Sequence, residues 1–124
     1  MKRARTLGES FFYAISGMLY AFRTQRNIKI HFMTALLVII FGYLLKLSIM
    51  ELLALSITIA LVLVAEMINT AIETVVDMYT QEYHPLAAVA KNVAAGAVLI
   101  SAINAIFVGY LIFYKRIVIL LSFK

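Results

Sequence analysis

Long apolar runs separated by short polar segments predict four helices in this chain. Residues 7–24 repeat apolar side chains every three or four positions, with polar ones opposite, which is typical of an amphipathic helix. Three further segments, at about residues 28–47, 49–79 and 87–114, are apolar enough and long enough to span a bilayer. We therefore expect an all-α integral membrane protein with a single domain, residues 1–124.

The first of these helices is too short and too polar to span a bilayer. Leu7, Phe11 and Ile15 lie on its apolar face. We expect the helix to lie in the membrane interface with this face toward the lipid. The segment of residues 23–31, RTQRNIKIH, is polar and basic and is interpreted as a hinge before the first span. Its last residue, His31, is interpreted as an interfacial anchor.

The last span carries a stripe of small residues, which lets membrane helices approach each other closely. The stripe consists of Ala90, Ala94, Ala97, Ser101, Ala105 and Gly109. It predicts a tight helical bundle and a homo-oligomer. Before this span, Pro85 disfavours helix at His84 and favours a new helix start, at about residue 86 or 87.

The composition agrees with a membrane protein. The chain is 65% hydrophobic and 14% charged, with a mean hydropathy of +1.00. A soluble domain is roughly half apolar and a quarter charged, so the apolar excess must face lipid or other subunits. Cysteine is absent, which excludes disulfides, thiolate metal ligands and a cysteine nucleophile.

The formal net charge of +5 raises the alternative of nucleic-acid binding. Six of the eleven Lys and Arg residues, however, precede or enter the first apolar run: Lys2, Arg3, Arg5, Arg23, Arg26 and Lys29. This asymmetry is typical of a cytoplasmic segment beside anionic lipid, so we expect no nucleic-acid partner. Residues 1–30 show no pattern of a cleavable signal peptide. Three spans then place the N-terminal region and the loop of residues 80–86 on the cytoplasmic side.

A polar stripe interrupts the second span near its end. Glu66, Asn69, Glu73 and Asp77 follow one another at spacings of three, four and four, within an arc of roughly 80° on one helical face. Acidic side chains at this depth are costly and therefore indicate function. Glu66 follows ~15 residues of the span, a rise of ~22 Å, so we expect it inside the membrane close to the exit side.

Three uses of this stripe remain open from the residues alone. Phosphoryl transfer would employ Glu66 as base for a lipid hydroxyl, Glu73 as ligand for Mg²⁺ and Lys91 as cation for phosphates. A cation or proton pathway also places acids inside a membrane. The third use is a structural hydrogen-bond network between helices. No P-loop, Gly-rich kinase loop or Rossmann fingerprint is present, so a nucleotide site would be of another type.

Three segments carry a resemblance to a known family. EMINTAIETVVD, EYHPLAAVAKNVAAGAVLI and RTQRNIKIH are similar, in order and spacing, to motifs of the small prokaryotic integral-membrane diacylglycerol kinase/undecaprenol kinase family. The resemblance implies a homotrimer in the bacterial inner membrane, with active sites between subunits at the cytoplasmic face. It implies transfer of the ATP γ-phosphoryl group, with Mg²⁺, to a lipid alcohol. Undecaprenol is the expected acceptor and diacylglycerol the alternative; an inactive lipid-binding homologue or a cation/proton conductor is the non-enzymatic alternative.

The resemblance also implies roles for individual residues. Glu66 would be the catalytic base and meet the lipid substrate, and Glu73 with Gln25 would bind the metal. The expected nucleotide-binding set is Tyr13, Gln25, Asn69, Glu73, Asp77, Glu82, Tyr83, His84, Lys91 and Asn92.

Two positions depart from the family pattern. The family usually has Glu at the position of Gln25 and Asp at that of Asn92, so each change removes one negative charge from the expected site. A low-activity member, an engineered inactive variant and a natural variation compensated elsewhere all fit these changes.

Overall fold

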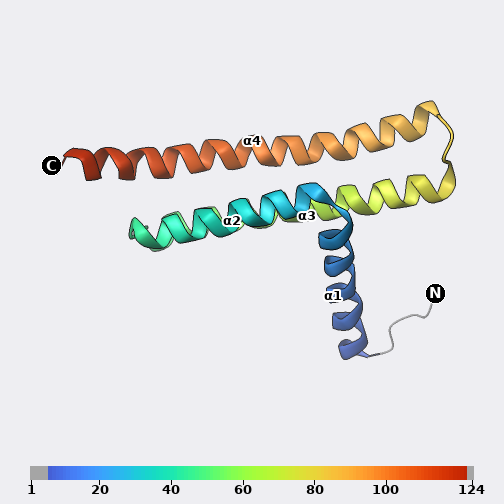
Figure 1. Cartoon of the computed structure of the whole chain (residues 1–124), viewed down its shortest axis with the longest axis horizontal. Helices are drawn as coiled ribbons and strands as arrows, with labels where there is room; N and C mark the ends of the chain where they lie inside the picture. Colours follow the sequence, from blue (N-terminus) through green and yellow to red (C-terminus); the bar gives the residue numbers. More distant parts are fainter. Residues whose placement is uncertain (1–5, 123–124) are drawn as a thin grey trace.

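The computed structural model describes residues 6–122, and these form four helices without a strand. The helices are α1 (Leu7–Thr24), α2 (Arg26–Leu44), α3 (Ile49–Tyr79) and α4 (Pro85–Ser122). Helices α2, α3 and α4 run alongside one another, whereas α1 runs across their direction (Figure 1). The last three helices are long and apolar enough to cross a membrane, α4 over Pro85–Ile119. The prediction of an all-α protein with three candidate spans is confirmed.

Helix α1 begins at a capping box. The Glu9 N–H donates to the Thr6 hydroxyl at 3.2 Å, and the Glu9 carboxylate accepts from the Thr6 N–H at 3.3 Å. Ala21 is the only buried residue of α1, and Leu7 and Phe11 are exposed. The interfacial position of this helix stays a prediction, which its exposed apolar side chains favour.

The hinge between α1 and α2 is shorter than expected. Only Gln25 leaves the helical conformation, with φ −99° and ψ 121°, and residues 26–31 already belong to α2. The expectation of a hinge over residues 23–31 was wrong, and the helix begins at Arg26, two residues before the expected start at about residue 28. Polar side chains do not by themselves break a helix, because their backbone groups still form the helical hydrogen bonds.

A Schellman turn ends α2 at Leu44, before the expected residue 47. The Leu47 N–H donates to the Gly42 carbonyl and the Lys46 N–H to the Tyr43 carbonyl, both at 3.1 Å. Lys46 adopts φ 50°, the left-handed conformation this turn requires. A Cβ at Gly42 would lie 3.1 Å from the Leu47 Cδ1, so the glycine lets the turn close tightly.

Helices α3 and α4 form the most extensive packing in the chain, and α2 packs against α3. Helix α4 starts at Pro85, a favourable first helical residue, instead of residue 86 or 87. It also continues to Ser122, past the expected end at residue 114. Lys115 and Arg116 are compatible with helix, and Arg116 also forms an ion pair with Glu51 of α3.

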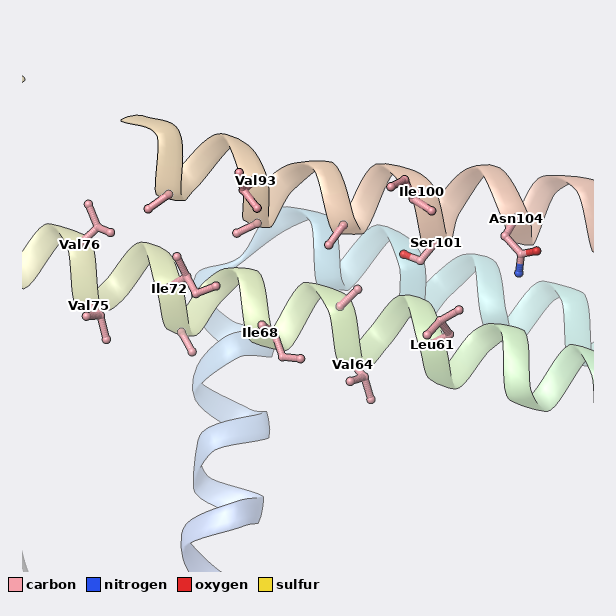
Figure 2. Close-up of a pocket in the computed structure, with 15 residues that line it drawn as sticks. Leu61, Val64, Ile68, Ile72, Val75, Val76, Val93, Ile100, Ser101 and Asn104 are labelled. Atoms are coloured by element: carbon pink, nitrogen blue, oxygen red, sulfur yellow. The ribbon is translucent and has the colours of Figure 1, made fainter. Parts of the chain in front are cut away.

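The core of a single chain is small. Its buried apolar residues are Ala21, Ile28, Ala35, Leu47, Leu55, Val62 and Ala94. A groove of about 1320 Å³ runs between α3 and α4; Figure 2 shows Ile72, Ser101 and Asn104 directed toward the space between these helices. Ala94 and Ser101 are buried, so part of the small-residue stripe packs within the chain. The homo-oligomer stays a prediction.

Candidate active site

The polar stripe of α3 is continuous and graded in exposure. Helix α3 runs without a break through Glu66, Asn69, Glu73 and Asp77. Glu66 and Asn69 are buried, Glu73 is half-buried and Asp77 is exposed. The same face therefore leads from the apolar interior of the helix bundle to its polar end.

Glu66 is the most deeply buried acid of the stripe, with an exposed fraction of 2%. Its Oε1 lies 3.2 Å from Nε2 of His31, which comes from α2. The Thr70 hydroxyl donates to the Glu66 main-chain carbonyl at 2.9 Å and leaves the carboxylate untouched. A carboxylate at this depth has lost most of its hydration, which is costly and marks Glu66 as a candidate site residue.

Asn69 and Glu73 follow Glu66 along the stripe and are hydrogen-bonded to each other. The Asn69 Nδ2 donates to the Glu73 Oε1 at 3.0 Å. The Asn69 Oδ1 is buried and has no hydrogen-bond partner among the residues the structure describes. A buried amide oxygen without a partner is uncommon and marks a position where a bound group can donate.

Asp77 and Lys91 join the polar ends of α3 and α4. The Lys91 Nζ lies 2.5 Å from the Asp77 Oδ1, and both side chains are partly exposed. The pair places a cation near the turn between the two helices. Lys91 can thus bind an anionic ligand if the ligand either displaces Asp77 from the ammonium group or binds that group together with Asp77.

Within residues 6–122, the other expected site residues form no hydrogen bond or ion pair with the polar stripe. Tyr13, Glu82, Tyr83, His84 and Asn92 are exposed, and Gln25 is half-buried at the α1–α2 hinge without a side-chain cap hydrogen bond. The loop that carries three of them is held by Thr80, whose hydroxyl accepts from the Glu82 N–H at 3.2 Å.

A Mg²⁺ ion fits this donor set only together with a ligand. Within residues 6–122 there is no group of three acidic or histidine side chains that could hold a metal. Mg²⁺ usually takes one or two carboxylates and completes its shell with phosphate oxygens and water. Glu73, which has one oxygen free of Asn69, suits that single-carboxylate role.

Sequence reasoning missed the contact of His31 with Glu66. A signal was present: Ile28, His31, Ala35 and Gly42 recur at helical spacing, and this face of α2 contains its buried residues. A histidine on the packing face of a span meets another helix, not the interface. The interfacial-anchor interpretation therefore overlooked a residue at the site.

Comparison with known proteins identifies the family. The model of the prokaryotic diacylglycerol kinase family matches residues 12–113. A diacylglycerol kinase of Synechocystis sp. is 50% identical over 101 residues, which cover 81% of this chain and 58% of that relative. An undecaprenol kinase of Bacillus subtilis is 40% identical over 109 residues, 88% of this chain and 89% of that relative.

A diacylglycerol kinase of Escherichia coli is 45% identical over 49 residues, 40% of each chain. The chain thus spans about three fifths of the Synechocystis relative and nearly all of the Bacillus one. Because the family match covers most of α1, all of α2 and α3 with the polar stripe, and most of α4, this chain belongs to the prokaryotic diacylglycerol kinase family.

Proposed function

We propose that this chain is an ATP-dependent kinase of a membrane lipid alcohol, with undecaprenol as its principal acceptor. The observation that carries the proposal is Glu66, a carboxylate that is 2% exposed inside an apolar helix and continuous with a polar stripe. A soluble substrate does not need a base at that depth, whereas a lipid hydroxyl does. The named relatives are kinases of diacylglycerol and undecaprenol, which agrees with this use.

The proposed reaction is a single in-line displacement. The lipid hydroxyl oxygen attacks the γ-phosphorus of ATP, its proton passes to the Glu66 carboxylate, and the bond from the γ-phosphorus to the bridging oxygen breaks to release ADP. Glu73, with Gln25, would hold Mg²⁺, which supplies charge neutralisation of the phosphates when bound. Gln25 contributes a neutral and weaker oxygen than a carboxylate would.

The nucleotide is proposed to bind at the polar end of α3 and α4. Lys91 offers a point charge for the phosphates, and Asp77 holds it in place before ATP arrives. The remaining nucleotide contacts are assigned to Tyr13, Asn69, Glu82, Tyr83, His84 and Asn92. Asn92 accepts a hydrogen bond from the ribose or base without the charge that an aspartate would bring.

A second copy of the chain is proposed to complete each site. In one chain Tyr83 is 86% exposed and Tyr13 46% exposed, so neither encloses a ligand. Large apolar side chains also remain exposed along all three spans, for example Ile39, Ile57 and Ile103. A homotrimer with sites between subunits would cover part of this surface and bring the separate residues together.

The active site is proposed to face the cytoplasm of a bacterial inner membrane. The basic residues around the first helix favour the cytoplasmic side for the N-terminal region. With three spans, the loop of residues 80–84 lies on the same side. ATP is available there.

The choice of acceptor rests on how the relatives align. The match to the undecaprenol kinase covers nearly the whole of both chains, which favours undecaprenol. Diacylglycerol is the second candidate, since the Synechocystis diacylglycerol kinase is 50% identical.

A paired acceptor assay tests the proposal. The purified chain in detergent micelles receives ATP and Mg²⁺ with either undecaprenol or diacylglycerol, and ADP release is followed. Lipid-dependent ADP release, faster with undecaprenol, is expected; a faster rate with diacylglycerol reverses the acceptor. The kinase proposal would be overturned if neither lipid stimulated ADP release and the chain conducted cations or protons in liposomes.

A further inference from the structure

In the part of the chain that the structure describes, His31 of α2 lies beside the Glu66 carboxylate. Among residues 6–122, no group makes a hydrogen bond of regular geometry to Oε1, and the only charged or imidazole atom within ion-pair distance is His31 Nε2, at 3.2 Å. Asn69 directs its amide N–H toward Glu73 instead. Among these residues, the ion-pair partner nearest to the Glu66 carboxylate therefore comes from a different helix.

His31 lies at the contact between α2 and α3. Its side chain is 27% exposed. It also lines a cavity of about 410 Å³ between α2, α3 and α4. Thr34, Thr58 and Val62 line the same cavity. The Thr34 and Thr58 hydroxyls donate to main-chain carbonyls of their own helices, so these two side chains do not compete with the imidazole for Glu66. The other polar side chain of the lining is Tyr110 of α4.

We propose that His31 is a positioning residue that holds the Glu66 carboxylate in the orientation required to accept the proton of the lipid hydroxyl. This inference rests on the proposed kinase function. Nε2 lies 3.2 Å from Oε1, so an N–H on this nitrogen would donate to Oε1 after a turn of the imidazole ring, which would leave Oε2 to face the incoming hydroxyl. The arrangement follows a general rule of base catalysis, in which a third group orients the base without touching the substrate.

Misplacing a reacting group by about 1 Å costs on the order of 100-fold in rate. His31→Leu removes the donor, so kcat should fall on the order of 10- to 100-fold while the KM for ATP stays within about twofold. His31→Gln retains an N–H near the Nε2 position and should recover most of kcat. Thr34→Val is the matched control, because it alters the same cavity one turn away and removes only a hydroxyl that its own helix satisfies.

The assay uses the full chain in micelles with ATP, Mg²⁺ and undecaprenol or diacylglycerol, and size-exclusion elution and thermal unfolding verify that each variant is folded. A His31→Leu protein with wild-type kcat, or a folded His31→Gln protein as impaired as His31→Leu, would overturn the proposal. A KM for ATP that rises as much as kcat falls would overturn it too, because that pattern indicates general damage to the site.

A measurement without turnover separates this inference from the proposed function. The chain contains two histidines, His31 and His84, and His84 is exposed in the loop before α4. The imidazole ¹⁵N resonances of His31, but not those of His84, should shift in Glu66→Gln. An unchanged His31 signal would overturn the contact. If the signal shifts and the wild-type chain releases no lipid-dependent ADP, the contact is real but the kinase function and the positioning role are both wrong.

Discussion

Arg116 of α4 forms an ion pair with Glu51 of α3, at the end of the helix pair that lies opposite the Asp77–Lys91 contact. Glu51 also accepts hydrogen bonds from the Ser48 N–H and hydroxyl, both at 2.7 Å. The separation between Glu51 and Asp77 along α3 nearly equals the separation between Lys91 and Arg116 along the antiparallel α4. The two ion pairs therefore fix one register of α4 against α3, and Glu66 lies between them.

Arg116→Leu should lower the thermal unfolding midpoint in detergent by several degrees. The half-buried Glu51 carboxylate would lose its ion pair with Arg116 while keeping the Ser48 hydrogen bonds, so the loss is partial. Lys115→Leu is the control, because it removes a neighbouring charge that is exposed. Equal losses in the two variants would show that the ion pair does not stabilise the register.

Lys46→Gly should stabilise the chain by about 1 kcal/mol. Lys46 occupies the left-handed position of the Schellman turn, where a side chain is strained and glycine is not. Unfolding in mixed micelles measures the change. Lys46→Ala is the control, since it removes the charge and keeps the Cβ; if Lys46→Ala gains as much as Lys46→Gly, backbone strain is not the reason.

The helices could be predicted because lipid imposes a simple rule on sequence. A span must be apolar for about 20 residues, so the runs that became α2, α3 and α4 are visible without any tertiary information. Their ends were harder to predict. Arg26 and Lys115 are compatible with helix, so the charged residues at the edges of the apolar runs do not mark where the helices end.

The candidate site was predictable along one helix and not between helices. The common face of Glu66, Asn69 and Glu73 follows from helical geometry, and the Asn69–Glu73 hydrogen bond is a contact one turn apart. The His31–Glu66 contact joins residues 35 positions apart, through the packing of α2 on α3. Spacing along the chain carries no such information.

Gln25→Glu should lower the Mg²⁺ concentration at half-maximal activity. A carboxylate is a stronger ligand for Mg²⁺ than a carboxamide, and the proposed metal site has only Glu73 as an acid. Glu73→Gln should raise the Mg²⁺ requirement steeply for the same reason. Titration of lipid-dependent ADP release with Mg²⁺ measures both effects. An unchanged Mg²⁺ dependence in Glu73→Gln would place the metal elsewhere.

Lys91→Gln should raise the KM for ATP by about tenfold or more, with a smaller effect on kcat. The substitution removes the cation proposed to bind the phosphates and leaves Asp77 as an unpaired negative charge beside them. Lys115→Gln serves as the control at the other end of α4. If the KM for ATP stays unchanged in Lys91→Gln, the nucleotide does not bind at this end of the stripe.

The central claim, that Glu66 is the base for a lipid hydroxyl, is tested most directly by Glu66→Gln. ATP binding and lipid-dependent ADP release are measured on the same folded preparation. We predict that ADP release falls by at least about 100-fold, because the isosteric amide does not accept the proton, while ATP still binds. A Glu66→Gln protein that turns over lipid within a few-fold of the wild-type rate would contradict the account.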